Sequence, residues 1–373
     1  MQRQFFSAVI LILVFSFISI QAQTDYSNGF DLKSLDKSVN PTQDFYDYAV
    51  GTWVKNNPVP DIYTRWGSFD KLQEDNNDVV KTILEECAAN KNWPKGSARQ
   101  KIGDFFATGM DSARIEKEGY KPILPFLKQI DKIKNKKELM DLVAEFHSEG
   151  LSPLFRFYVN IDRKKSDMNV AQLSQGGTGL PDVEYYTKDD ARSKEIREKY
   201  SQHVANMFKL IGVDAMEAEK NAQTIMDIET QLAKVSNTRL ENRDPIKTYN
   251  KMTLNNLKYI TGDFDWDSYF NDLGIEKLNV VVVGQPKFFT EMSKIFDNVS
   301  LNDWKTYLKW NLLRSAASEL SSAFVNEEFD FNGKFMNGQK AIQPRWKRIM
   351  RNVNRSMGEL LGEIYVDKVF PGR

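Results

Sequence analysis

Apolar residues recur at helical spacing along most of this 373-residue chain, and no other feature constrains its fold as strongly. Phe45, Tyr48, Ala49 and Trp53 occupy positions i, i+3, i+4 and i+8, which places them on one face of a helix. A long helix is predicted after a turn at Gly67. Similar spacing predicts helices within segments 97–120, 136–151, 189–212, 218–240, 254–260, 265–274 and 301–331, and in a closing segment at 356–368.

The helical period is interrupted near the middle of the chain. The runs at 154–162 and 168–177 are rich in β-branched and aromatic residues and are separated by a charged turn, a pattern typical of a hairpin. One further strand-like run covers Val280 to Val283. We therefore predict a mainly α fold, with one or more multi-helix lobes and one small β-hairpin.

The N-terminus has the pattern of a secretory signal. Arg3 is followed by an apolar run from Phe5 to Ile20 and by Ala22, which together make up a basic start, a hydrophobic stretch and a small residue. We predict a signal peptide at 1–22 and a polar linker at 23–40, and hence a periplasmic or extracellular protein. The run is short for a membrane span, so cleavage is preferred to an uncleaved anchor. No cysteine stands directly after the run, which argues against a lipid anchor.

The composition limits the classes of partner and of cross-link. Lys+Arg and Asp+Glu both number 51, so the charge balance does not favour a nucleic-acid partner. Cys87 is the only cysteine, so no internal disulfide can form and the core must hold the fold by itself. We expect Cys87 to be a buried small hydrophobe.

Neither histidine is placed to form a zinc site. His147 and His203 are the only two, and a zinc hydrolase needs a pair one helical turn apart. We expect both at a helix surface or interface. Glu363 and Asp367 share one helix face, which could serve a metal, but without histidine ligands a solvated face is the simpler interpretation. We therefore predict no catalytic residue, metal ligand or cofactor in this chain.

A basic cluster lies near the C-terminus. Arg345, Lys347, Arg348, Arg351 and Arg355 alternate with apolar residues, a pattern that indicates an amphipathic helix with a basic exterior. A solvated face is expected, and docking against an acidic neighbour is the alternative.

Five segments, in order, resemble successive blocks of the neprilysin and endothelin-converting-enzyme family of zinc metallopeptidases. They are "NPTQDFYDYAVGTWVKNNPVPDIYTRWGSFDKLQEDN", "KIGDFFATGMDSARIEKEG", "GGTGLPDVEYY", "IETQLAKVSNTRLENRDPIKTYNKMT" and "RWKRIMRNVNRSMGELLGEIYVDKVF". The resemblance implies that residues 41–373 form the family's N-terminal helical domain. The family's catalytic half, with its Asn-Ala-Tyr, His-Glu-x-x-His and Glu-x-x-x-Asp segments, is absent from this sequence.

The resemblance also implies a function and partners. The full enzyme would cleave oligopeptides with a bound zinc, and the helical part would limit which peptides enter. The partners implied are the missing zinc catalytic domain and oligopeptide substrates, and this chain would be inactive alone. A fragment, a split gene and a degenerate relative remain open. The alternative is a stand-alone periplasmic binding or interaction protein.

One site is carried over residue by residue. The family's Arg-aromatic-Gly-x-Phe-Asp motif stands here as "RWGSFD" and gives Arg65 and Asp70. The resemblance implies that Arg65 contacts the C-terminal side of bound peptides, where its guanidinium would bind a carboxylate through two hydrogen bonds. The alternative is an Arg65–Asp70 pair that fixes the turn before the long helix.

Overall fold

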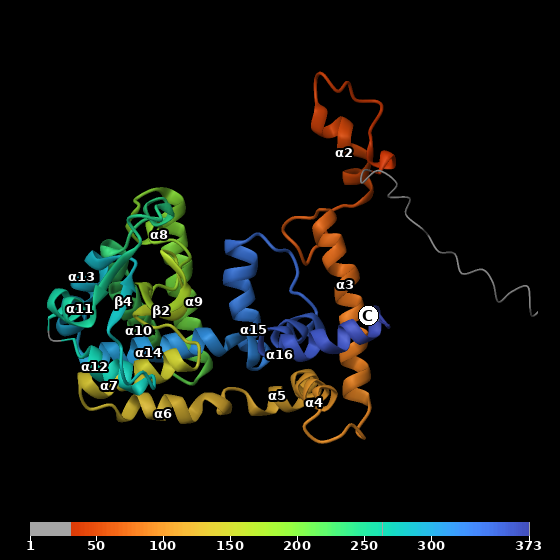
Figure 1. The fold of residues 1–373 in the computed structure, drawn as a ribbon. Helices are drawn as coiled ribbons and strands as arrows, with labels where there is room; N and C mark the ends of the chain where they lie inside the picture. The colour runs from red at the N-terminus through yellow and green to blue at the C-terminus, as the bar shows by residue number, and fades with distance from the viewer. Residues whose placement is uncertain (1–30, 263, 373) are drawn as a thin grey trace, which may run out of the picture. The chain divides into compact units, whose positions relative to one another are not determined.

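The computed structural model describes residues 31–262 and 264–372, and the predicted signal peptide at 1–22 lies outside them. The chain divides after Asp70 into two compact units. Most of the described residues are helical, as predicted, and four strands form one sheet (Figure 1). No helix in the described ranges is long and apolar enough to cross a membrane.

Most helices follow the predicted segments, but the helices Leu124–Lys132, Glu184–Thr187 and Pro286–Asn298 were not predicted. The α-helices are α2 (Phe45–Asn56), α3 (Ser68–Ala89), α4 (Ala98–Met110), α5 (Ser112–Glu118), α6 (Leu124–Lys132), α7 (Lys136–Ser148), α8 (Glu184–Thr187), α9 (Ala191–Leu210), α10 (Ala215–Val235), α11 (Leu254–Thr261), α12 (Trp266–Asp272), α13 (Pro286–Asn298), α14 (Leu301–Ala316), α15 (Ser322–Glu328) and α16 (Arg345–Val369). Short 3-10 helices are η2 (Leu32–Ser34), η3 (Lys121–Ile123), η4 (Glu241–Arg243) and η5 (Ala317–Glu319), and η6 (Phe329–Met336) is a π-helix.

The first unit contains α2 and the "RWGSFD" turn. The Asp44 side chain accepts a hydrogen bond from the Asp47 backbone and begins α2. Asp36 binds Lys55 at 2.5 Å, and this ion pair joins the segment before α2 to the end of that helix. Phe45 is 69% exposed, so this unit is held by polar contacts more than by an apolar core.

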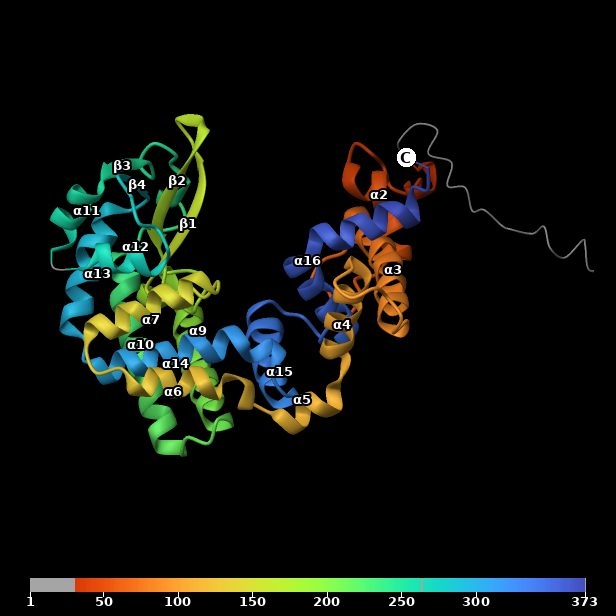
Figure 2. The same cartoon turned by 60° about the horizontal axis from the view of Figure 1, so that its bottom comes forward.

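The sheet contains the predicted hairpin and two strands more. Strands β1 (Phe155–Asp162) and β2 (Lys165–Gln175) pair antiparallel, and the strand order is β1-β2-β4-β3. Strand β4 (Val280–Val283) runs parallel to β2 and antiparallel to β3 (Asn250–Thr253). Figure 2 shows the β1–β2 hairpin extending beyond the other strands. The predicted run at Val280–Val283 is thus an inner strand of a four-stranded sheet.

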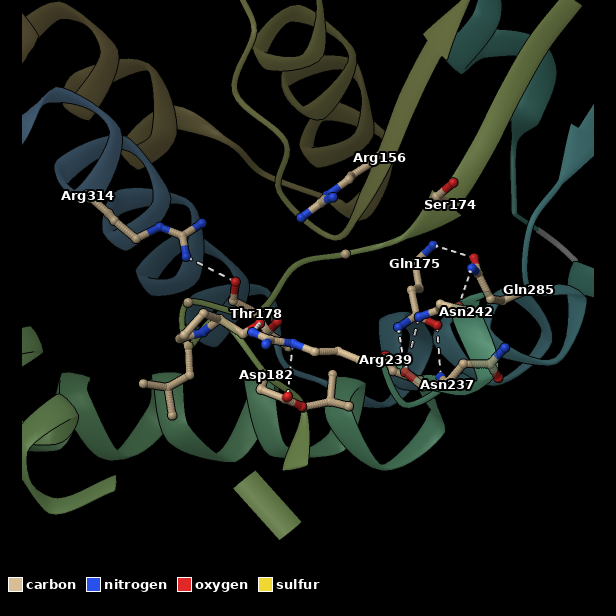
Figure 3. A pocket seen from close by; sticks show the side chains of 16 residues that line it. Arg156, Ser174, Gln175, Thr178, Asp182, Asn237, Arg239, Asn242, Gln285 and Arg314 are labelled. Carbon is tan, nitrogen blue, oxygen red and sulfur yellow. Dashed lines mark hydrogen bonds and ion pairs between the residues drawn. The ribbon is translucent and has the colours of Figure 1, made fainter. Parts of the chain in front are cut away.

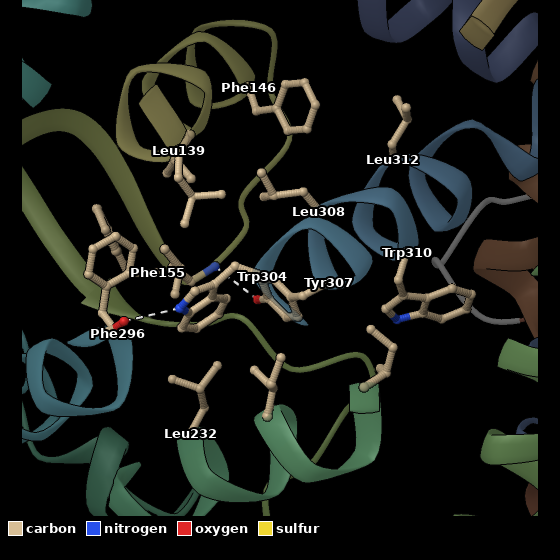
Figure 4. Close-up of a cluster of buried hydrophobic side chains, with 14 of the residues drawn as sticks. Leu139, Phe146, Phe155, Leu232, Phe296, Trp304, Tyr307, Leu308, Trp310 and Leu312 are labelled. Carbon is tan, nitrogen blue, oxygen red and sulfur yellow. Dashed lines mark hydrogen bonds between the residues drawn. The ribbon is translucent and has the colours of Figure 1, made fainter. Parts of the chain in front are cut away.

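A large apolar core lies between one sheet face and the helices of the second unit. Alternation along the strands sends Phe155, Leu173, Val281 and Val283 into this core. Helix α14 crosses it with Trp304, Tyr307 and Trp310 fully buried (Figure 4). The Trp304 indole donates to the Phe296 carbonyl at 3.1 Å, so its polar atom is satisfied inside the core.

A small core joins α3, α4 and α16. Its members are Ile83, Leu84, Cys87, Ile102, Phe106, Ile349, Met350, Val353, Leu361 and Ile364. Cys87 is 2% exposed, which confirms its prediction as a buried small hydrophobe. The two predicted C-terminal helices are one element, α16, with a kink at Met357, whose φ is −141° and ψ 33°.

Burial corrects the prediction of a wholly solvated basic face on α16. Lys347 is only 4% exposed and forms an ion pair with Glu74 of α3. Its ammonium also lies 5.3 Å from the centre of the Trp346 ring. The buried ammonium is tolerated because a carboxylate compensates for the lost solvation. The neighbouring Arg351 and Arg355 are exposed, as expected.

Candidate functional site

A glycine-rich loop at 176–183, between β2 and α8, passes very close to the buried core. A Cβ atom on Gly179 would lie 1.7 Å from the Tyr200 hydroxyl. One on Gly177, whose φ is +81°, would lie 2.6 Å from the Leu154 carbonyl oxygen. Only glycine fits these two positions, so the sequence of the loop matches its path through the fold.

Buried hydroxyl groups fix the backbone of this loop. The Tyr186 hydroxyl accepts hydrogen bonds from the backbone amides of Gly179 and Leu180 at 3.0 and 2.8 Å. Tyr307 donates to the Gly177 carbonyl at 2.7 Å. We define the glycine loop together with these tyrosines as the anchored loop.

Glu229 of α10 lies behind the anchored loop and is completely buried. Its carboxylate accepts hydrogen bonds from Tyr186 at 2.5 Å and from Tyr200 at 2.9 Å. Burial raises the pKa of Glu229, while the nearby Arg314 guanidinium opposes that rise. Arg314 donates to the Thr178 carbonyl at 3.0 Å, so the same polar group reaches the loop from α14.

A pocket of about 590 Å³ opens on the solvent side of the anchored loop (Figure 3). It lies where β2 and β4, the parallel pair, end at Gln175 and just before Gln285. The carboxyl ends of parallel strands are a common place for ligands. Its lining residues are Arg156, Ser174, Gln175, Gly176, Thr178, Gly179, Leu180, Pro181, Asp182, Val183, Ser236, Asn237, Arg239, Asn242, Gln285 and Arg314.

Side-chain amides form one wall of this pocket. Gln175 donates to the Asn237 carbonyl at 2.9 Å and accepts from the Asn237 backbone amide at 2.8 Å. Gln285 accepts from the Gln175 backbone amide at 2.9 Å and donates to the Asn242 side chain at 2.8 Å. These bonds hold the wall in one arrangement before any ligand arrives.

Arg65 and Asp70, the predicted substrate-binding residues, lie in the first unit. Arg65 is exposed, and Asp70 is half-buried in the first turn of α3. In the described ranges no hydrogen bond or ion pair joins Arg65 to Asp70. The turn is accompanied by a ring contact between Tyr63 and Trp66, whose centroids are 5.1 Å apart.

His147 is tied to the large core. Its two ring nitrogens lie 2.6 Å from the Tyr269 hydroxyl and 3.0 Å from the Pro153 carbonyl oxygen. Burial lowers the pKa of His147 to about 4, so this imidazole is neutral at physiological pH.

His203 lies at an interface between helices, which is one of the two positions expected for it. This residue is 1% exposed and lies between two glutamates, with Nδ1 3.0 Å from Glu327 and Nε2 3.4 Å from Glu328. Its ring stacks on Phe331 of the π-helix at 4.8 Å. Burial alone would lower the pKa of His203, but the two carboxylates outweigh that effect and raise it. The sequence did not identify these two carboxylates as partners, because they come from a distant segment of the chain.

The described residues do not fit a zinc site. No group of three or more histidine, cysteine, aspartate or glutamate side chains in 31–262 and 264–372 could hold a metal ion. Glu363 and Asp367 are exposed on α16, in agreement with a solvated face. His147 is occupied by core hydrogen bonds, and His203 is held between Glu327 and Glu328.

Comparison with known proteins identifies the family of the chain. Residues 41–373 match the sequence profile described as peptidase family M13. The chain belongs to this family. It is 29% identical over 353 residues to endothelin-converting enzyme 1 of Bos taurus, covering 91% of this chain and 46% of that protein. Neprilysin-3 of Drosophila melanogaster is 26% identical over 365 residues, with 91% and 46% covered.

A solved M13-type structure has the same fold. The inhibitor complex of the Mycobacterium tuberculosis zinc metalloprotease Zmp1 superposes with a TM-score of 0.87 and 29% identity, covering 92% of this chain and 52% of that one. The chain therefore spans about half the length of the M13 relatives that it matches. This confirms the family resemblance and the mainly helical fold.

The sequence analysis quoted the glycine loop only as part of a family block and did not single out Glu229. A usable signal was present, because Glu229 stands on the apolar stripe of α10 between Ile225, Ile228 and Leu232, all of which are buried. A lone carboxylate on a buried helix face needs partners. Nothing in the local sequence, however, identifies Tyr186 or Tyr200 as those partners.

Proposed function

We propose that this chain is the non-catalytic helical part of a secreted zinc metalloendopeptidase that degrades oligopeptides, and that it controls which peptides reach the zinc. The observation that carries the proposal is the match of 41–373 to family M13, over about half the length of relatives that include a zinc metalloprotease. Zinc-dependent hydrolysis is assigned to residues outside this sequence. The contribution of this chain is to bind and orient peptides.

Arg65 is the residue proposed to contact the substrate. It is exposed, and no partner for its guanidinium appears among the described residues. An arginine in this state can receive a carboxylate with two parallel hydrogen bonds. Asp70, five positions later, is proposed to contribute to the same site from the start of α3.

The test combines the chain with a zinc-binding half of the M13 type, fused or supplied separately. Peptide cleavage is then measured on matched free-acid and C-terminally amidated peptides. Arg65→Ala should lower kcat/KM about ten- to a hundredfold on the free acids, since a charge-assisted hydrogen bond contributes roughly 1.5–3 kcal/mol. Arg65→Lys should recover only part of this loss.

Two results would contradict this assignment. An equal loss on acid and amide peptides, with a lower melting temperature, would make Arg65 a turn-fixing residue. No cleavage by the recombined protein, under conditions where the M13 half folds and binds zinc, would reject the peptidase proposal. Arg114→Ala, at an exposed arginine of α5, is the matched control.

The second candidate function is that of a binding or interaction protein without catalysis. The pocket beside the anchored loop favours this candidate, because all of its lining residues belong to this chain. Both candidates are proposed to be secreted. N-terminal sequencing of the mature protein would test cleavage near Ala22, and the DNA that follows the codon for Arg373 would discriminate the two candidates. A downstream frame encoding His-Glu-x-x-His supports the peptidase.

A further inference from the structure

Three arginines line the pocket beside the anchored loop, and one of them has no polar partner among the described residues. Arg239 is paired with Asp182 at 2.9 Å, and Arg314 is bound to the loop carbonyl of Thr178. Arg156 of β1 is exposed and has no polar partner among the described residues. Figure 3 shows its guanidinium directed from the strand toward the glycine loop.

The position of Arg156 is fixed by the strand register. It stands directly opposite Ser174, and Tyr158 stands opposite Gln172, so these side chains share the sheet face that points away from the core. The Arg156 Cγ atom would lie 3.2 Å from a Cβ built on Gly176. The stem of Arg156 therefore rests on the loop, and its charged end is left for a ligand.

The pocket continues along this polar sheet face. A second hollow of about 310 Å³ shares Ser174, Asn242 and Gln285 with the first. It adds Tyr158, Asn160 and Arg163 to the lining, and the Arg163 guanidinium is bound to the Thr248 carbonyl at 2.7 Å. Together the two hollows offer a run of hydroxyl and amide groups that leads to a single free guanidinium. A linear ligand with amide groups and one negative charge complements this arrangement.

We propose that this pocket is a binding site for a peptide carboxylate, with Arg156 as the residue that meets the charge. The amide wall of Gln175, Asn237 and Gln285 would border the peptide backbone. The choice of a peptide rests on the proposed function, because peptides are the substrates proposed there. The carboxylate has two sources, a chain terminus or an acidic side chain, which the experiment separates.

The anchored loop explains how such a site is held ready. Glu229, Tyr186 and Tyr307 fix the loop backbone from the core side, so ordering the loop adds little cost at the moment of binding. A carboxylate bound by Arg156 would lie outside this buried network, so Arg156 can be replaced without removing any hydrogen bond of the fold.

The experiment measures equilibrium binding of fluorescently labelled peptides to the full chain by anisotropy. Three peptides of equal length are used: a neutral amidated peptide, the same peptide with a free C-terminus, and an amidated peptide with one internal glutamate. At least one carboxylate peptide should bind about tenfold more tightly than the neutral amide, as expected for one charge-assisted bond. Which one does so identifies the source of the carboxylate.

Variants then assign the contact. Arg156→Ala should remove the tenfold preference, Arg156→Lys should restore part of it, and Arg156→Glu should reverse it. Arg114→Ala should leave it unchanged. Equal affinity for all three peptides, no detectable binding, or a preference that survives Arg156→Ala would each overturn the site. The proposed peptidase function is tested separately by cleavage with the restored M13 half, so either can fail while the other stands.

Discussion

Single residues in this protein take their properties from contacts made far along the chain. Glu229 is a carboxylate in the middle of a large apolar core, and it is stable there because Tyr186 and Tyr200 donate hydrogen bonds to it and Arg314 lies nearby. Removing one partner from such a network leaves the others buried and unpaired, which costs more than the network itself contributes.

We expect Glu229→Ala to lower the free energy of unfolding by about 3–5 kcal/mol, because two tyrosine hydroxyls would lose their buried acceptor and Arg314 would lose a nearby negative charge. Glu229→Gln, which keeps the shape and an acceptor oxygen, should lose less. Urea denaturation measures both. Glu198→Ala, at an exposed glutamate of α9, is the control and should change stability by less than about 0.5 kcal/mol. Equal effects at the two positions would contradict the role of Glu229.

We predict that the two histidines contribute to the free energy of unfolding with opposite pH dependences. The pKa of His203 is raised in the folded protein, so its contribution is fully present below the unfolded pKa of about 6.5 and is lost as pH rises through the folded pKa. The pKa of His147 is lowered to about 4, so its contribution is present above about 6.5 and is lost as pH falls toward 4.

Melting temperatures of the wild type, His203→Gln and His147→Gln, recorded from pH 4 to 9, test this pair. His203→Gln should flatten the decline of stability on the alkaline side, and His147→Gln should flatten the decline on the acid side. Each variant serves as the control for the other. A wild-type stability that rises between pH 7 and 9 would be inconsistent with an imidazolium held by Glu327 and Glu328.

At the scale of elements, the contact between α3 and α4 depends on one glycine. A Cβ on Gly103 would lie 2.3 Å from the Cys87 carbonyl oxygen and 2.5 Å from its carbonyl carbon. Because both atoms belong to the backbone, they cannot rotate away as a side chain would. The two helices would have to separate, and the small core that they share with α16 would be disturbed.

Gly103→Ala should therefore destabilise the protein by about 1–3 kcal/mol, the usual cost of overpacking. The matched control is Gly362→Ala on α16, where nothing lies within 4 Å of the added Cβ. That change should be neutral or stabilising by up to about 1 kcal/mol, because alanine favours a helix over glycine. Chemical denaturation compares the two, and a neutral Gly103→Ala would show that the helices can move apart freely.

Helical elements were more predictable than the sheet. Helix α10 and the β1–β2 hairpin follow from local periodicity, because each repeats its own pattern over many residues. Strand β3 has four residues and was not predicted, since its pairing with β4 is decided by contacts distant in the chain. The predicted long helix at 301–331 is divided into α14, η5, α15 and part of the π-helix.

For the molecule as a whole, we predict that the purified chain binds no zinc stoichiometrically. The reason is the absence of a histidine pair at ligand spacing in the sequence. Metal analysis after exhaustive dialysis measures this, with a zinc metallopeptidase that contains His-Glu-x-x-His treated in parallel. One tightly held zinc per chain would disprove it, and Glu363→Ala and Asp367→Ala would then show whether the exposed carboxylates of α16 take part.

The sequence by itself determined the helical class, the hairpin and the M13 family, because these depend on local spacing and on ordered motifs. Only the tertiary structure decided which polar residues are buried. His203 meets Glu327 124 positions away, and Lys347 meets Glu74 at a separation of 273 positions. The polar pocket beside Arg156 could not be predicted from the sequence either. Its wall combines a strand end, a glycine loop and a helix end, which become neighbours only when the apolar core forms.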